Sequence, residues 1–166
     1  MVKVRSLLIT LMVIGIGIWT FIHFSQSEEK KVRKQFDLLS EWASKVQSET
    51  PLVMAQKTKK IGTLFADNCV LDVPLYSTSG SFTREEIISY AVRGRLLFSE
   101  LYLRFYDLTV TFPEEGTAKV SSTARLTGRL NIGESVDEIH ELECVLRKIE
   151  KRWFFSHLEV VEVLKR

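Results

Sequence analysis

An unbroken apolar segment near the start of the chain is the strongest feature of its hydrophobic pattern. Leu7 to Phe24 comprises 18 residues without an Asp, Glu, Lys or Arg. As an α-helix it would be about 27 Å long, close to the thickness of the hydrocarbon core of a bilayer. The pattern therefore predicts one transmembrane helix, with residues 1–27 forming an N-terminal tail and anchor.

Basic residues lie on both sides of this segment. Lys3 and Arg5 precede it, and residues 30–34 contain four more, next to two glutamates. Because the first pair adjoins the segment directly, we expect the N-terminus inside and the rest of the chain on the extracytoplasmic, periplasmic side. A cleaved signal peptide is the alternative, since Ser25 and Ser27 form a small-x-small pattern. We favour a retained single-pass anchor, because signal peptides have an apolar region of only about 7–15 residues.

Residues 28–166 are predicted to form one domain, because they contain neither a Pro/Gly/Ser-rich linker nor an internal repeat. Its first helix follows from apolar residues spaced four and three positions apart, namely Val32, Phe36, Leu39, Ala43 and Val46. A coiled coil continuing from the membrane helix would need a longer heptad pattern than this. We therefore expect an amphipathic helix that packs on its own domain.

Two more helices are predicted from the capping patterns at their N-termini. Thr50-Pro51 places an N-cap residue before a proline at the first helical position, and this second helix is expected to end near Phe65 or Ala66. Thr83 and Glu86 have the spacing of a capping box, and the third helix is expected to end within residues 94–99.

The rest of the pattern predicts strands. Residues 69–73 form a short strand that ends at Pro74, and residues 77–81 (STSGS) form a loop. Four longer strands follow as an antiparallel meander, at Tyr102 to Phe112, Lys119 to Leu130, Ile139 to Ile149 and Trp153 to Leu164. The fold class is therefore α+β, with three N-terminal helices packed on one face of a curved antiparallel sheet.

Alternation in the second long strand predicts which residues face the helices. Val120, Ala124, Leu126 and Leu130 are expected on the concave face. The convex face then carries polar residues: Lys119, Ser121, Thr123, Arg125, Thr127 and Arg129. In the last strand the pattern leaves two registers open, with either Trp153, Phe155 and Val161 or Phe154, Leu158 and Val160 outward.

Composition and charge exclude several classes of function. The chain has 166 residues, of which 45% are hydrophobic, so it is not a disordered protein. A formal net charge of +2 does not support a nucleic-acid partner. Two cysteines exclude a disulfide scaffold and a four-cysteine zinc module, although a Cys69–Cys144 disulfide stays open for an extracytoplasmic domain. No P-loop, GxGxxG, GxSxG or HExxH motif is present, so no cofactor is predicted.

Histidine and cysteine offer few candidates for chemistry. His140 with Glu138 and His157 with Glu159 form i, i+2 pairs, each of which could supply two metal ligands. Neither pair has a third ligand at a recognised spacing, so we predict no metal site. Cys69 could act as a thiol nucleophile with either histidine as its base, but a cysteine in an apolar strand is normally a buried structural residue.

One segment carries a resemblance to a known family. The sequence LFADNCVLDVP, from Leu64 to Pro74, is followed by TREEI from Thr83 to Ile87. This pattern, with the order of elements over residues 30–164, resembles the nuclear transport factor 2-like superfamily, which includes SnoaL-like proteins and ketosteroid isomerases. The resemblance implies a cone-shaped domain whose curved sheet wraps around the helices and whose open end is often a pocket.

The isomerases of that superfamily have a catalytic Asp directly before the proline of the short strand. Here that residue is Val73, which cannot transfer a proton, and the neighbouring Asp72 should point to the opposite face. The resemblance places the second catalytic acid near Glu143. No catalytic residue is therefore predicted, and isomerase chemistry is disfavoured.

The leading functional hypothesis is a membrane-anchored, non-catalytic binding or assembly domain. Its partners would be the membrane, through Leu7 to Phe24, and a protein or a second copy bound weakly by the convex face of the sheet. The alternative is a small-molecule-binding or SnoaL-like enzymatic pocket protein. An open cavity with a carboxylate or histidine would favour this alternative, and the candidate lining residues are Trp42, Asp72, Tyr76, Phe105 and Trp153.

Overall fold

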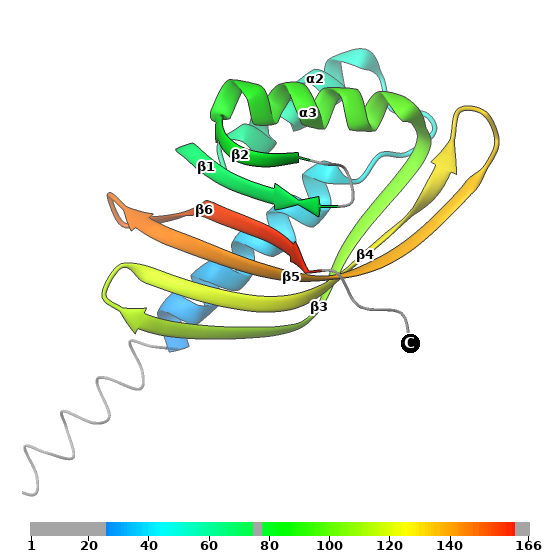
Figure 1. Ribbon diagram of the computed structural model, residues 1–166. Coiled ribbons are helices and arrows are strands. Elements are labelled where there is room, and N and C mark those ends of the chain that lie inside the picture. The colour runs from blue at the N-terminus through cyan, green and yellow to red at the C-terminus, as the bar shows by residue number, and fades with distance from the viewer. Residues whose placement is uncertain (1–25, 75–77, 162–166) are drawn as a thin grey trace, which may run out of the picture. The chain divides into compact units, whose positions relative to one another are not determined.

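The computed structural model describes residues 26–74 and 78–161 (Figure 1). The chain divides into two compact units, residues 1–31 and residues 32–166, and the fold described below is that of the second. Helical residues 26–43, here called the first helix, contribute residues 32–43 to this unit. The other elements are α2 (Pro51–Gly62), β1 (Phe65–Val73), β2 (Thr78–Thr83), α3 (Arg84–Leu97), β3 (Phe98–Glu114), β4 (Thr117–Leu130), β5 (Ser135–Ile149) and β6 (Arg152–Val161).

The six strands form one sheet in the order β2-β1-β6-β5-β4-β3. Strands β3 to β6 make the predicted antiparallel meander, but β1 pairs with β6 in parallel, so the expectation of a purely antiparallel sheet is wrong. The loop predicted at residues 77–81 is also wrong, because residues 78–83 form β2 and pair with β1. This segment is polar and contains Gly80, a composition that an edge strand tolerates.

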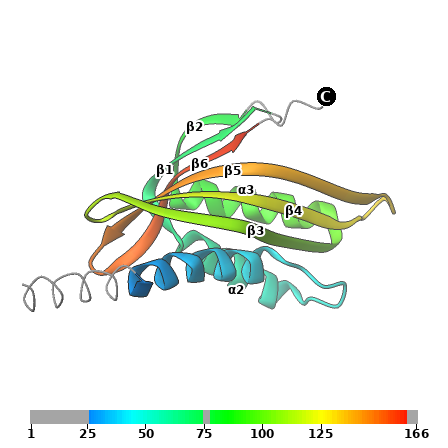
Figure 2. The same ribbon diagram turned by 90° about the horizontal axis from the view of Figure 1, so that it is seen from below.

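The helices lie on one side of the curved sheet, as predicted for an α+β fold (Figures 1 and 2). Val32, Phe36 and Leu39 of the first helix are buried in the core. The Phe36 ring meets the rings of Phe105 and Phe155 edge to face, with centroids 5.2 and 5.0 Å apart. Residues 32–43 of the first helix therefore pack directly over the middle of the sheet.

Both predicted helix starts are confirmed, and one predicted end is not. Thr50 caps α2, and Thr83 and Glu86 form a reciprocal capping box on α3. Helix α2 ends at Gly62 rather than at Phe65 or Ala66. The residues that follow pair with the sheet instead: the backbone N–H of Phe155 donates to the carbonyl of Leu64, and β1 begins at Phe65.

β-Bulges in β3 and β6 change which residues face the core. In β3 the register shifts around Asp107, which has a φ of 53°. In β6, Val145 pairs with His157 but Leu146 pairs with Phe155, so Ser156 is the extra residue. As a result the core side of β6 carries Trp153 and Phe155 before the bulge and Leu158 and Val160 after it. Both registers that the sequence left open for this strand are therefore wrong, because each assumed an unbroken alternation.

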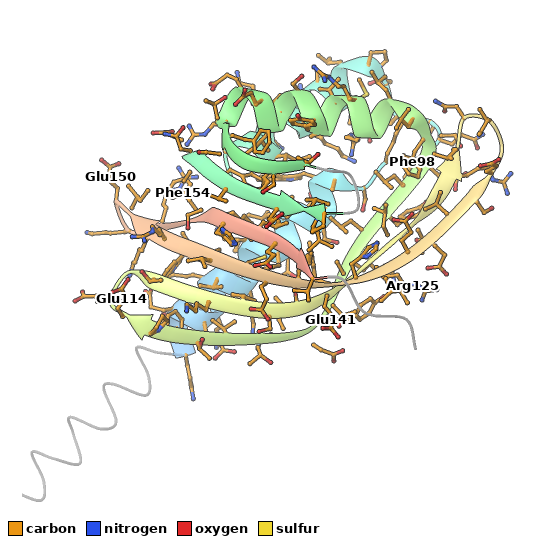
Figure 3. All side chains as sticks on the ribbon, in the orientation of Figure 1. Phe98, Glu114, Arg125, Glu141, Glu150 and Phe154 are labelled. Atoms are coloured by element: carbon orange, nitrogen blue, oxygen red, sulfur yellow. The ribbon has the colours of Figure 1, made fainter. Side chains whose placement is uncertain are left out.

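The predicted alternation of β4 is confirmed. Val120 and Ala124 are buried on the concave face, and Arg125 and Arg129 are exposed on the other. The long hairpins of the sheet turn near Glu114 and Glu150, which Figure 3 labels.

The predicted transmembrane segment, Leu7 to Phe24, lies outside the described residues. Among the helices that the structure does describe, none is both long and apolar enough to cross a bilayer.

Candidate functional site

A cavity of about 190 Å³ opens between the first helix and the concave face of the sheet. Eleven of the described residues line it, and nine of these are apolar. They come from the first helix and from five of the six strands, and they are Leu39, Val73, Leu103, Phe105, Ala124, Leu126, Leu142, Leu158 and Val160. The cavity therefore exists because the core is incompletely filled where the curved strands pass beneath Leu39.

The other two described lining residues are polar: Glu138 and His140, which stand two positions apart on β5. They alternate with exposed residues and share a face with the buried Leu142, which directs both side chains to the concave side. Opposite them on β4 stand Leu126 and Ala124, and the small alanine leaves room beside the imidazole.

Glu138 and His140 contact each other at the mouth of the cavity. His140 Nε2 lies 3.3 Å from Glu138 Oε2, and their side chains are 28% and 42% exposed. A carboxylate beside an imidazole fixes the orientation of the ring. The pair can therefore accept or donate a proton at one end of an otherwise apolar cavity.

Of the four described residues that were predicted to line a pocket, one lines this cavity. Phe105 lines the cavity, whereas Trp42 and Trp153 are not among its lining residues. Trp153 packs in the core against Phe112, with ring centroids 5.8 Å apart, and Trp42 lies under the ammonium of Lys60. Asp72 alternates with the lining residue Val73 on β1 and so points to the convex face, and Tyr76 lies outside the described residues.

The positions of the isomerase-type acids carry no acid in this cavity. Val73, which stands where ketosteroid isomerases have their base, does line the cavity, but with an apolar side chain. Glu143, the position expected for the second acid, is exposed on the convex face between the buried Leu142 and Cys144. Among the described lining residues, Glu138 and His140 are therefore the ones that could transfer a proton.

The cysteines do not form a reactive site. Cys69 and Cys144 are buried free thiols, so the disulfide left open by the sequence is not formed. Burial raises the pKa of each thiol to about 12, and a protonated thiol is a poor nucleophile. Among the described residues, no group of three or more His, Cys, Asp and Glu side chains could hold a metal ion.

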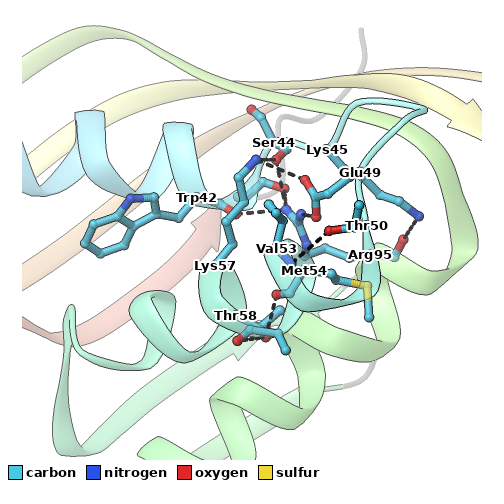
Figure 4. Close-up of polar contacts among 12 residues, drawn as sticks. Trp42, Ser44, Lys45, Glu49, Thr50, Val53, Met54, Lys57, Thr58 and Arg95 are labelled. Carbon is cyan, nitrogen blue, oxygen red and sulfur yellow. Dashed lines mark hydrogen bonds and ion pairs between the residues drawn. The ribbon is translucent and has the colours of Figure 1, made fainter.

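A buried cluster of charges secures the end of the first helix near the cavity (Figure 4). Arg95 of α3 donates from Nη1 to the carbonyls of Trp42, at 2.8 Å, of Ser44, at 3.0 Å, and of Ala43. Its Nη2 pairs with Glu49, which also receives a 3.0 Å hydrogen bond from Lys57. The guanidinium thus caps the carbonyl groups at the C-terminal end of the helix that places Leu39 over the cavity.

The pair of Glu138 and His140 was visible in the sequence, but its location was not. The i, i+2 spacing indicated a shared face, and the next residue in that alternation, Leu142, is apolar. That apolar continuation was the signal that this face is the inner one. Which other elements would meet it depended on the long-range pairing of β1 with β6.

No protein-family model and no curated protein sequence matches the chain. Solved structures do share its fold. A protein assigned as a scytalone dehydratase from Novosphingobium aromaticivorans is 16% identical, with a TM-score of 0.67 over 84% of this chain and 87% of that one. A protein of the nuclear transport factor 2-like family from Streptomyces avermitilis, assigned as a dehydratase, is 13% identical, with a TM-score of 0.66 over 84% of this chain and 99% of that one.

A type 2 hexachlorocyclohexane dehydrochlorinase is 10% identical, with a TM-score of 0.67 over 82% of this chain and 86% of that one. At such identities the likeness establishes the fold alone. The domain therefore has the α+β fold of nuclear transport factor 2-like and SnoaL-like proteins, as the resemblance of Leu64 to Pro74 implied.

Proposed function

We propose that the domain binds a small, largely apolar molecule in the cavity beneath the first helix. The observation that carries the proposal is an open apolar cavity with two polar side chains, Glu138 and His140, at its mouth. Apolar cavities of about 150 Å³ bind benzene, so about 190 Å³ accommodates one ring with a short substituent. The open cavity therefore supports the hypothesis of a small-molecule-binding protein over that of a binding or assembly domain with a filled interior.

A proton-transfer enzyme is a second candidate, favoured by the contact between His140 and Glu138. An imidazole oriented by a carboxylate beside an apolar cavity has the parts of a general base. The dehydratases and the dehydrochlorinase among the solved structures of this fold are consistent with such chemistry, though they do not assign it to this chain.

The proposal includes the membrane anchor and the weak homodimer expected from the sequence. The apolar segment from Leu7 to Phe24 would hold the cavity domain at the periplasmic face of a membrane. Carbonate extraction of membranes tests this, because an anchored chain stays in the pellet. Release of a shorter soluble chain beginning near Glu28 would instead show a cleaved signal peptide.

Filling the cavity tests the binding proposal. Ala124→Leu would place three additional carbons in the cavity, and Thr123→Leu adds a leucine on the opposite face of the same strand as a matched control. We expect binding of single-ring compounds by the full-length chain, measured by calorimetry, to weaken at least tenfold in Ala124→Leu only. Equal binding by both variants would place the ligand elsewhere, and Leu126→Phe provides a second cavity-filling variant if Ala124→Leu fails to fold.

A further inference from the structure

We infer that a shallow hollow on the convex face of the sheet binds an aromatic carboxylate, with the carboxylate on Arg104 and the ring against a tyrosine. The hollow measures about 180 Å³, and the described residues that line it are Tyr102, Arg104, Tyr106, Arg125 and Thr127. It lies on the opposite face of the sheet from the cavity beneath the first helix. The inference therefore goes beyond the proposed function and does not depend on it.

Alternation along β3 places two tyrosines and an arginine on the convex face. Tyr102, Arg104 and Tyr106 are exposed, and they alternate with Leu103 and Phe105, which line the cavity on the concave side. Side chains two positions apart on a strand are about 7 Å apart, so a tyrosine ring lies on each side of Arg104 along β3. Tyr102 and Tyr106 are 38% and 42% exposed, which leaves part of each ring open to a ligand.

The positive charges at the hollow are only partly balanced by protein carboxylates. Arg104 pairs in register with Arg125 of β4, which Figure 3 labels, so two guanidinium groups stand side by side on this face. Like charges directly opposite each other destabilise a sheet. Asp137 compensates Arg125 through hydrogen bonds of 2.9 and 2.7 Å. The side chain of Arg104 makes no ion pair or hydrogen bond with any residue that the structure describes, so its charge is available to an anion.

A carboxylate attached to a ring matches this arrangement. The N–H groups of a guanidinium fit the two oxygens of a carboxylate, and such charge-assisted hydrogen bonds are stronger than those between neutral groups. The hydroxyl groups of the two tyrosines and of Thr127 can donate further hydrogen bonds. A ligand ring can pack on a tyrosine in the offset or edge-to-face geometry of aromatic pairs. Cavities of about 150 Å³ hold benzene, so the hollow is large enough for one ring and its carboxylate.

Benzoate, benzamide and acetate test the two parts of this inference. Benzamide has nearly the shape of benzoate without its charge, and acetate keeps the charge without the ring. The experiment is a ligand-detected NMR titration of the full-length chain in neutral maltoside micelles, with empty micelles as the blank. It is done at low micromolar protein, where the proposed homodimer does not form. We expect benzoate to bind at least fivefold more tightly than either of the other two. Benzoate that binds no more tightly than either one, or not at all, would overturn the inference.

Substitutions on the two faces of the sheet show where benzoate binds. Arg104→Gln should reduce the preference for benzoate over benzamide to less than twofold. Arg129→Gln removes an equal charge from the same face, at a position that does not line the hollow, and should leave the preference unchanged. Ala124→Leu fills the cavity on the other face and should leave it unchanged too.

A preference that survives Arg104→Gln, or that is lost equally in Arg129→Gln, would contradict the inference. Loss of benzoate binding in Ala124→Leu alone would place the ligand in the cavity, which would overturn the inference and support the proposed function. If Arg104→Gln does not fold, Tyr106→Leu provides a second variant of the hollow, and it should weaken benzoate binding at least threefold. Unchanged binding by Tyr106→Leu would then refute the site.

Discussion

Arg95 is the largest fully buried side chain among the described residues, and its charge is balanced within a compact cluster. Three backbone carbonyls and the carboxylate of Glu49 receive its hydrogen bonds, while Lys57 supports Glu49 from the other side. Buried charges of this kind are costly unless every partner is present. The cluster joins α3 to the end of the first helix, whose Leu39 lines the cavity.

Removing Arg95 should therefore destabilise the domain strongly. Arg95→Met leaves Glu49 buried with one basic partner and removes the donor to the carbonyls of Trp42 and Ala43, while Lys57 still donates to that of Ser44. We expect a loss of about 3–5 kcal/mol in the free energy of unfolding. Arg93→Met, in the exposed part of the same helix, is the control and should change stability by less than about 0.5 kcal/mol. Denaturant titration measures the free energy of unfolding of both variants. Equal changes in the two would show that the cluster contributes little to stability.

The same cluster predicts an acid-dependent loss of stability. Burial opposes the ionisation of Glu49, but hydrogen bonds from Arg95 and Lys57 outweigh it, so the pKa of Glu49 lies below its ordinary value. A carboxylate whose pKa is lowered by folding stabilises the fold above its unfolded pKa of about 4.3, and this contribution is lost as the pH falls through the folded pKa.

The difference in the free energy of unfolding between the unmodified chain and Glu49→Gln should thus be constant near neutral pH. It should shrink as the pH falls below about 4.3. Chemical denaturation at a series of pH values measures this difference. A difference that is independent of pH would show that Glu49 is not ionised in the cluster.

At the scale of elements, the sequence predicts helices and strand faces well where the signals are local. The capping box of Thr83 and Glu86 and the alternation of β4 both depend on residues close together in the chain, and both are confirmed. The parallel pairing of β1 with β6 joins distant segments, as in the pair of Val70 and His157, which are 87 positions apart, and no local pattern encodes it. The cavity, whose wall includes Val73 of β1 and Leu158 of β6, could not be predicted for the same reason.

The bulges are an intermediate case, because a signal was present in the sequence. Apolar residues alternate at Leu101, Leu103 and Phe105 and then resume one position out of phase at Leu108 and Val110. The residue at the break is Asp107, and aspartate adopts a positive φ more readily than most residues do. A change in the phase of the apolar alternation at such a residue indicates a β-bulge. The bulge at Ser156 in β6 has no residue with a positive φ.

Replacing glycine by alanine should change the stability of the domain in opposite directions at two positions. Gly94 lies inside α3 with open space around its Cα, so Gly94→Ala should stabilise the domain by about 0.5–1 kcal/mol through helix propensity. Gly128 lies where a Cβ would collide with the carbonyl oxygen of Glu100, so Gly128→Ala should destabilise it by about 1–3 kcal/mol. Thermal unfolding of the two variants checks the signs, and stabilisation by both would mean that β3 and β4 approach less closely than described.

At the scale of the whole domain, the convex face of the sheet carries mostly basic charges on β3 and β4 and mostly acidic charges on β1, β5 and β6. Strands β3 and β4 carry the exposed Arg104, Arg125 and Arg129, with Tyr102 and Tyr106 flanking Arg104 around a shallow hollow of about 180 Å³. Strands β1, β5 and β6 carry acids on the same face, namely Asp72, Glu141, Glu143 and Glu159. Two copies related by a two-fold axis could therefore place the basic half of one on the acidic half of the other.

This charge distribution supports the weak homodimer expected from the sequence and predicts that it depends on salt. On this face β4 carries only polar side chains rather than the apolar centre that stable dimers bury, so the attraction that we propose is mainly electrostatic and is screened at high ionic strength. We expect residues 28–166 to associate at tens of micromolar in low salt and to sediment as monomers in molar salt. Arg104→Glu should abolish the low-salt association, whereas Arg93→Glu, on α3 rather than on the sheet, should not. A dimer that persists in molar salt at micromolar protein, or a monomer under every condition, would refute the proposed contact.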